Sequence, residues 1–301
     1  MLFGNDKIQE IICTKAREIA SEINGKIVFG AMVGSISQGV HAADSDYDTR
    51  FLYIRDDFPA NILNPAVCKE KDIVTRYYPE SGLFYDKIPL WELSSFLQFI
   101  VNPVIDGEHS AGLHHNIAWT FFSPYVWDPY GLVSKLTPMI YPVCNVKLEL
   151  QHHISKIEEF FDREDDILLK NYLYASIAAA SVYYIEKFST YAPIHIDSLM
   201  GVEERETIRQ TIYKLIGRMR EESERYIQNT DEFVLQGSHY NIRTAHEREL
   251  DEYILEAFQL GKRMLQSLGD EYGKTIAGDM VERMYTVIEH AMKEQVVRGL
   301  F

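Results

Sequence analysis

The chain has 301 residues, of which 46% are hydrophobic and 25% charged, and its formal net charge is −15. This length favours two domains and leaves ample apolar material for a core. The acidic balance argues against a protein that coats nucleic acid, because such a surface repels polyanions unless a local basic patch intervenes. It does not argue against an enzyme that binds one triphosphate, because a divalent metal can bridge acidic side chains and phosphate.

Targeting and redox signals are weak throughout the chain. Residues 1–10 are polar and lack the apolar run of a signal peptide, and no stretch of about 18 apolar residues predicts a membrane span. The three cysteines, Cys13, Cys68 and Cys144, are too scattered for a disulfide framework or a zinc knuckle. We therefore expect a cytoplasmic protein with unpaired thiols and no membrane partner.

The first half of the chain mixes helix and strand patterns. Apolar residues at helical spacing predict a helix over 5–23, which Asn24-Gly25 ends. Runs of branched and aromatic residues predict strands over 26–33, 47–54, 72–78 and 83–90, and a second helix is expected over 91–101. This order predicts a small mixed sheet with helices, a domain that we expect to span residues 1–145.

The second half has helical apolar spacing almost throughout. The segments with this spacing are 146–161, 168–188, 203–226, 245–268 and 275–297. Thr244 and Glu247 form a plausible capping box at the start of the fourth segment. We expect an all-helical domain over residues 146–301, in which tyrosines and methionines at helical spacing belong to the core.

One segment combines features of a phosphate and metal site. Gly34-Ser35 is followed, ten residues later, by Asp46-Tyr47-Asp48. On a predicted strand, side chains two residues apart point to the same face, and two carboxylates there repel each other unless a cation lies between them. Hard cations such as Mg²⁺ or Mn²⁺ take oxygen ligands of this kind. The spacing therefore predicts a metal site on Asp46 and Asp48.

The Gly34-Ser35 turn is the expected partner of that metal site. Glycine lets backbone N–H groups approach a phosphate closely, and a short helix is expected to follow from Ser35. Gly39 permits a second tight turn before the return strand. Each short motif alone occurs often by chance as a turn, a cap or a solvated face. In this order they favour nucleotidyl or phosphoryl transfer, which needs metal on one side and phosphate donors on the other.

The pattern Gly34-Ser35-x10-Asp46-x-Asp48 resembles the signature of the DNA polymerase beta superfamily of nucleotidyltransferases. The longer run GSISQGVHAADSDYDTRFLYI, residues 34–54, resembles the narrower RlaP-like family, which is linked to RNA repair. The likeness continues more loosely over 90–103 and 170–188. It implies an α+β fold, in which a polymerase beta-like catalytic domain is followed by a helical domain.

The resemblance also implies roles for individual residues. Gly34 and Ser35 would hold the phosphates of an NTP substrate. Asp46 and Asp48, with a third carboxylate, would bind two Mg²⁺ ions for in-line attack on the α-phosphate. The third carboxylate is expected at Asp86, with Asp72 and Glu92 as rivals.

The resemblance points to an RNA 3′ end as the acceptor, such as a tRNA or a cleaved RNA. Arg50 lies two residues after Asp48 and is expected to reach a phosphate near the metals. Further basic residues that would extend this strip are Arg55, Arg76, Lys147, Lys156 and Lys170. Two alternatives stay open: a toxin-type enzyme that modifies protein with the same chemistry, and a nucleotide-binding module without turnover.

Two other sets of residues receive a structural interpretation. The pairs His114-His115 and His152-His153 are interpreted as surface or core histidines, because adjacent histidines rarely face one ion. Basic residues in 203–226 alternate with glutamates, which favours a solvated helix with ion pairs along its surface.

Overall fold

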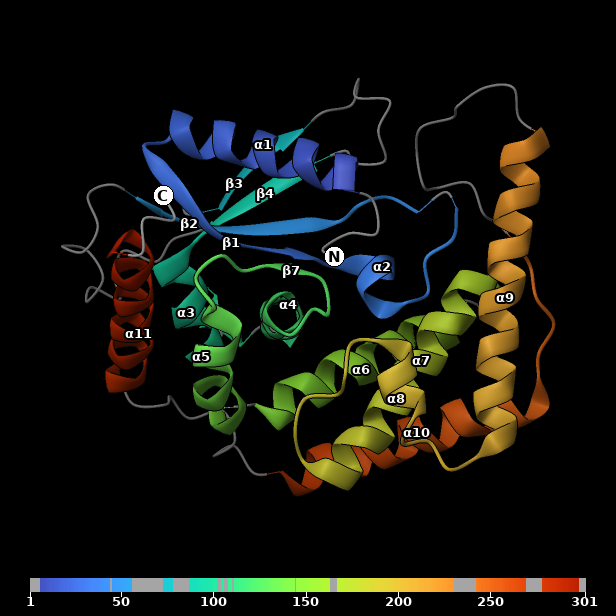
Figure 1. Cartoon of the computed structure of the whole chain (residues 1–301). Coiled ribbons are helices and arrows are strands. Elements are labelled where there is room, and N and C mark those ends of the chain that lie inside the picture. The colour runs from blue at the N-terminus through green and yellow to red at the C-terminus, as the bar shows by residue number, and fades with distance from the viewer. Residues whose placement is uncertain are drawn as a thin grey trace.

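A computed structural model describes most of the chain (Figure 1). The described residues are 6–43, 45–55, 73–77, 87–101, 104–105, 108–109, 111–143, 145–162, 167–229, 242–268 and 278–297. Asp72 and Asp86, two of the acids considered above, lie outside these ranges. Within the ranges, no helix combines the length and the apolar character that a membrane span requires.

A five-stranded sheet forms the centre of the first half, in the order β3-β4-β2-β1-β7. Its strands are β1 (Gly25–Met32), β2 (Thr49–Arg55), β3 (Ile73–Tyr77), β4 (Lys87–Glu92) and β7 (Val126–Trp127). β2 and β4 pair in parallel, whereas the other neighbours are antiparallel. The expected small mixed sheet is therefore confirmed. Two short strands, β5 (Val104–Ile105) and β6 (Glu108–His109), pair apart from it.

Helices cover both faces of the sheet (Figure 1). On one face, α1 (Asp6–Glu22) buries Ile12 and Ile19 against Phe51 and Tyr53 of β2. The helices of the other face are α3 (Leu93–Val101), α4 (Ala111–Phe121) and α5 (Leu132–Ile140), with a short 3₁₀ turn at Tyr141–Val143 after them. Successive side chains of a strand point to opposite faces of the sheet. Both faces are apolar here because helices cover each of them.

Five of the helices that the structure describes after residue 145 pack together, and we call them the helical half. They are α6 (Val146–Phe161), α7 (Leu169–Phe188), α8 (Ile196–Met200), α9 (Glu206–Asn229) and α10 (Arg248–Ser267). α7 contacts the other four, and its alanines 178–180 are buried. Small side chains let neighbouring helices approach closely. The predicted capping box is wrong. Glu247 is itself the N-cap residue of α10 and its side chain makes no capping hydrogen bond, while the Thr244 hydroxyl accepts a hydrogen bond from Arg218.

The last helix, α11 (Gly278–Val297), packs away from the helical half. Its Met284, Ile288 and Ala291 are buried in one cluster with Phe96 of α3 and Leu136 of α5. α11 thus completes the apolar cluster between the sheet, α3 and α5. We call this cluster the first core. The division of the chain at residue 145 stays a prediction.

Candidate functional site

The Gly-Ser turn lies at the end of β1. α2 (Gly34–Gln38) begins there, which confirms the expected short helix, and Gly34 has a left-handed φ of 69°. A Cβ atom at Gly34 would lie 2.3 Å from Asp48 Oδ2, so the carboxylate lies directly against this glycine. The Val33 N–H also donates to the Asp48 carbonyl at 2.8 Å. The fold therefore brings the Gly34 turn and Asp48 together.

The aspartate pair, Asp46 and Asp48, lies in the loop that leads into β2. β2 begins at Thr49, so the predicted strand began two residues too early. Regular pairing with β1 ends at the Met32–Thr49 pair because the chain turns left-handed at Gly34. Asp46 is exposed and Asp48 half-buried. Both residues are thus accessible to solvent at the N-terminal end of β2.

Tyr174 of α7 lies close to both members of the aspartate pair. Burial raises the pKa of its hydroxyl to about 12, and the negative charges of Asp48 and Asp46 contribute to the increase. Such contributions require short distances, because water screens charges that lie far apart. The helical half therefore reaches the aspartate pair through this tyrosine, which the sequence interpretation had placed in the core.

The loop between the Gly-Ser turn and the aspartate pair is held by the helical half. We call residues 39–43 the connecting loop. Gly39 closes α2 with a φ of 73°, which confirms the expected tight turn, and a Cβ there would lie 2.6 Å from the His195 ring. The carbonyls of Gly39 and His41 accept hydrogen bonds from Arg220 of α9 at 2.9 and 3.1 Å. Val40 is buried in the core of the helical half.

Arg50 points to α4. Its guanidinium donates to the Asn116 carbonyl at 2.6 Å, to Thr120 Oγ1 at 2.9 Å and to Asn116 Oδ1 at 3.1 Å. Its Cζ lies 5.5 Å from the centroid of the Trp91 ring. Burial lowers the pKa of Arg50 to about 10, and the charge of Asp48 opposes this shift. These contacts tie β2 to α4 beside Asp48, while phosphate contact by Arg50 stays a prediction.

Glu92, one rival for the third carboxylate, links the end of β4 to the first turn of α3. It ends β4, where it pairs with Tyr53 of β2, and it is buried. Its Oε2 accepts a hydrogen bond from the Ser95 N–H at 3.0 Å, at the start of α3. A carboxylate that accepts from the first turn of a helix caps it. Glu92 lies toward the end of β2 that is remote from Asp48.

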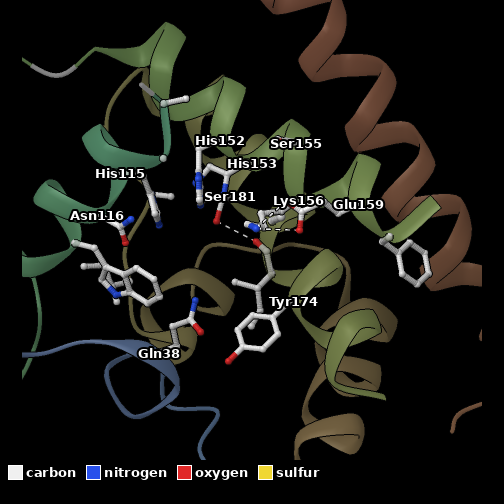
Figure 2. Close-up of a pocket in the computed structure, with 18 of the residues that line it drawn as sticks. Gln38, His115, Asn116, His152, His153, Ser155, Lys156, Glu159, Tyr174 and Ser181 are labelled. Carbon is white, nitrogen blue, oxygen red and sulfur yellow. Dashed lines mark hydrogen bonds and ion pairs between the residues drawn. The ribbon is translucent and has the colours of Figure 1, made fainter. Parts of the chain in front are cut away.

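A cavity of about 710 Å³ opens beside the Gly-Ser helix (Figure 2). Gln38 of α2 and Tyr174 lie at one end of it, and His115, His152 and His153 lie at the other. The walls come from α4, α6 and α7. Tyr174, whose pKa burial and the charges of the aspartate pair raise, links the cavity wall to the predicted metal site.

A family model described as "RNA repair pathway DNA polymerase beta family", RlaP, matches residues 8–101. This segment is therefore similar to the RlaP family. The matched span holds α1, the Gly-Ser turn, the aspartate pair and α3, and the α+β fold agrees with the polymerase beta-like class. The match suggests a polymerase beta-like nucleotidyltransferase role. No curated protein matches the chain.

The basic residues singled out in the sequence are divided between faces of the molecule. Lys156 and Lys170 line the cavity, and Lys156 pairs with Glu159 at 2.8 Å. Arg76 of β3 instead pairs with Glu22 of α1. Of the basic residues predicted to form a strip, Lys156 and Lys170 thus lie on the cavity wall.

The basic residues of α9 divide in a similar way. Ion pairs link Arg209 to Glu206 and Lys214 to Glu247, as expected for a solvated helix. Arg220, in contrast, holds the connecting loop. The interpretation of this helix as a solvated surface is therefore only partly right, because one arginine acts between the two halves.

The histidine pairs separate into different environments. His114 is buried and its Nε2 lies 2.9 Å from the Tyr191 hydroxyl, as the core interpretation predicts. His115, in contrast, lies on the cavity wall and approaches Glu149 of α6, as does His153. The two histidines of one pair thus do not face the same point. One histidine from each pair, His115 and His153, instead approaches Glu149. The only local sign of this in the sequence is the charged Glu149 among buried apolar residues of α6.

Proposed function

We propose that this chain is a metal-dependent nucleotidyltransferase that moves a nucleotide from an NTP to an acceptor hydroxyl. The observation that carries the proposal is the contact between the Asp48 carboxylate and Gly34, within the span that matches the RlaP family. A phosphate held at the backbone of the turn would lie beside this carboxylate. That is the arrangement in which one cation can contact both.

Asp46 and Asp48 are the residues that would hold the metal. Both are accessible to solvent, as a hydrated Mg²⁺ or Mn²⁺ requires, and both supply only oxygen. A bound metal would supply charge stabilisation for the triphosphate during in-line displacement of pyrophosphate. The negative charges of both carboxylates contribute to the raised pKa of Tyr174, which supports a location of both near this tyrosine.

Asp86 is our proposed third carboxylate. β2 and β4 pair in parallel, with Phe51 beside Leu90, and this register continued backwards brings Lys87 level with Asp48. Asp86 immediately precedes Lys87 in the sequence. Glu92 lies at the opposite end of β4 and caps α3. These observations support Asp86 over Glu92.

The second rival, Asp72, is disfavoured by the pairing of β3. Its neighbour Ile73 pairs with Trp91, beside Glu92 and away from Asp48. A metal site on the aspartate pair needs its third ligand within a few ångströms. We therefore keep Asp86 as the proposal.

The proposed acceptor is an RNA 3′ end. The RNA repair role that the RlaP family suggests supports this class, and Lys156 and Lys170 are basic groups on the wall of the cavity. With a net charge of −15, we expect weak and local binding directed at a terminus. Nucleotide addition should therefore fall steeply as salt concentration rises.

The test is incubation of the full chain with each labelled NTP and Mg²⁺, in separate reactions with RNA that carries a 3′ hydroxyl, with the same RNA blocked by a 3′ phosphate, and with total protein. The expected label is on hydroxyl-ended RNA alone, and Asp48→Asn is the matched inactive control. Label that appeared on protein and never on RNA would replace this acceptor with the protein-modifying alternative. Pyrophosphate release equal in wild type and Asp48→Asn would overturn the mechanism.

A further inference from the structure

Three side chains at the far end of the cavity form a compact group, which we call the histidine–glutamate cluster. His115 comes from α4, and Glu149 and His153 come from α6. One ligand atom of each lies within 4.8 Å of the others. His115 Nδ1 is 2.9 Å and His153 Nε2 is 3.3 Å from the same Glu149 Oε1. Glu149 and His153 are one helical turn apart and therefore share a face of α6.

The cluster contains polar atoms that hydrogen bonding does not satisfy. The side chains of Glu149 and His153 are 3% and 8% exposed. Glu149 Oε2 is buried and has no hydrogen-bond partner among the residues that the structure describes, and the buried His153 Nε2 has only the 3.3 Å contact with the Glu149 carboxylate. Buried polar atoms are nearly always paired, because an unpaired one is costly. These atoms lie on one face of α6, and His115 approaches the same carboxylate from α4, so that together they form the donor set of a cation site.

We propose that the histidine–glutamate cluster binds one divalent transition-metal ion of the Zn²⁺ type. The ligands are His115 Nδ1, the Glu149 carboxylate and His153 Nε2. Imidazole nitrogens favour Zn²⁺, Co²⁺ or Ni²⁺ over Mg²⁺. Metal–ligand distances of about 2.1 Å place tetrahedral ligands roughly 3.4 Å apart, which small shifts from the present separations achieve. This inference does not rest on the proposed nucleotidyl transfer.

The cavity gives this site an open side. His115, His152 and His153 all line it, and Figure 2 shows them gathered at one end. Two histidines and one glutamate from the protein leave a fourth tetrahedral position, the composition of zinc sites that exchange water for another ligand. The fourth ligand would be water or an oxygen of a molecule in the cavity. The metal would also bridge α4 and α6, which belong to different halves of the chain.

The test uses the full chain after treatment with a chelator, titrated with Co²⁺ and with Zn²⁺. We expect one equivalent of either ion to bind, and Co²⁺ to give the intense visible absorption of four-coordinate nitrogen and oxygen ligation. Asp48→Asn should bind the same equivalent, because the aspartate pair is a different site. A wild-type chain that binds neither ion stoichiometrically would overturn the proposal and leave a hydrogen-bonded network between two helices.

Variants assign the ligands. His153→Ala and Glu149→Gln should weaken Co²⁺ affinity by more than the roughly 10–100-fold typical of residues outside the ligand shell. His290→Ala is the matched control, because His290 also faces a glutamate one turn away, at 3.4 Å, yet it is exposed. Glu149→Gln keeps the side-chain shape, so a folded protein is available even where His153→Ala is unstable. Unchanged affinity in folded Glu149→Gln would overturn the assignment.

Discussion

The aspartate pair and the histidine–glutamate cluster lie near opposite ends of one cavity, yet they differ in every property that selects an ion. Asp46 is exposed and Asp48 half-buried, they supply only oxygen, and they lie on a loop inside the RlaP span. The cluster is largely buried, supplies two nitrogens, and lies on two helices beyond residue 101. Mg²⁺ retains waters and prefers the first environment, whereas Zn²⁺-type ions prefer the second. If both proposed sites bind metal, burial and ligand type would therefore direct different ions to them.

The two sites also differ in how they are held. The cluster lies on two packed helices, so helix contacts set its geometry. The aspartate pair follows the connecting loop, which depends on Arg220 and Val40 for its position. We therefore expect substitutions far from the aspartate pair to change turnover, and substitutions at the cluster to change metal affinity and stability.

The largest effect is expected for Asp48→Asn and Asp46→Asn. Each removes negative charge from the proposed metal site, and pyrophosphate release in Mg²⁺ should fall by at least about 10²–10³-fold. Co²⁺ binding at the cluster should not change. Asp162→Asn, at the exposed end of α6, is the control for removal of one surface carboxylate. Wild-type turnover in both variants would show that the aspartate pair is not catalytic.

Gly34→Ala should have the next largest effect. The new Cβ would lie 2.3 Å from Asp48 Oδ2, and the left-handed φ disfavours any side chain. We expect turnover to fall by about 10²-fold, since misplacement by 1 Å has effects of this size. The free energy of unfolding should fall by about 1–2 kcal/mol. Kinetics and chemical denaturation measure the two effects.

Gly217→Ala provides the control for this substitution. Gly217 lies within α9, and an added Cβ there meets no atom within 4 Å. Alanine is the better helix former, so stability should stay constant or rise by up to about 1 kcal/mol. Equal NTP affinity and turnover in Gly34→Ala and Gly217→Ala would remove the Gly34 turn from the proposed site.

Arg220→Ala should have a smaller effect on turnover, of about tenfold, which corresponds to about 1.4 kcal/mol. It removes two hydrogen bonds to the connecting loop but no group at the aspartate pair. The control is Arg225→Ala on the same helix, where the arginine pairs with Glu221 and Glu222. If both variants turned over NTP equally, the connecting loop would not need support from α9.

The smallest effect on turnover is expected for Glu149→Gln, within about twofold in Mg²⁺, because hard cations do not need the cluster. Its thermal unfolding should instead lose the dependence on Zn²⁺. Zn²⁺ at 100 times its Kd should stabilise the wild type by about 2.7 kcal/mol. Calorimetric scans with and without Zn²⁺ measure this difference. A Zn²⁺-dependent melting temperature retained in Glu149→Gln would contradict it.

Sequence patterns predicted the long elements well and the short ones poorly. The predicted bounds of the helix at 146–161 agree with those of α6, because sixteen residues of regular apolar spacing leave little ambiguity. α4, with the sequence AGLHHNIAWTF, was not predicted. Its two histidines, its glycine and its weak apolar periodicity obscure a helix that packing against α6 stabilises.

The same reasoning explains which site was found from the sequence. The Gly34 turn and the aspartate pair lie within fifteen residues of each other, so a local motif indicates them. His115 and Glu149 are 34 residues apart and meet because α4 packs on α6. Periodicity shows which face of a helix is buried but not which helix it meets. A site of this kind becomes visible only with the tertiary structure.

The position of α11 has a consequence for how the protein is made. Met284, Ile288 and Ala291 belong to the first core, although strands β1 and β2 of that core precede residue 56. A nascent chain on the ribosome therefore has its sheet, α3 and α5 in place long before their last packing partner is translated. Until then, apolar faces of α3 and α5 stay uncovered and available to chaperones or to aggregation. Completion of the first core therefore waits until α11 has been synthesised.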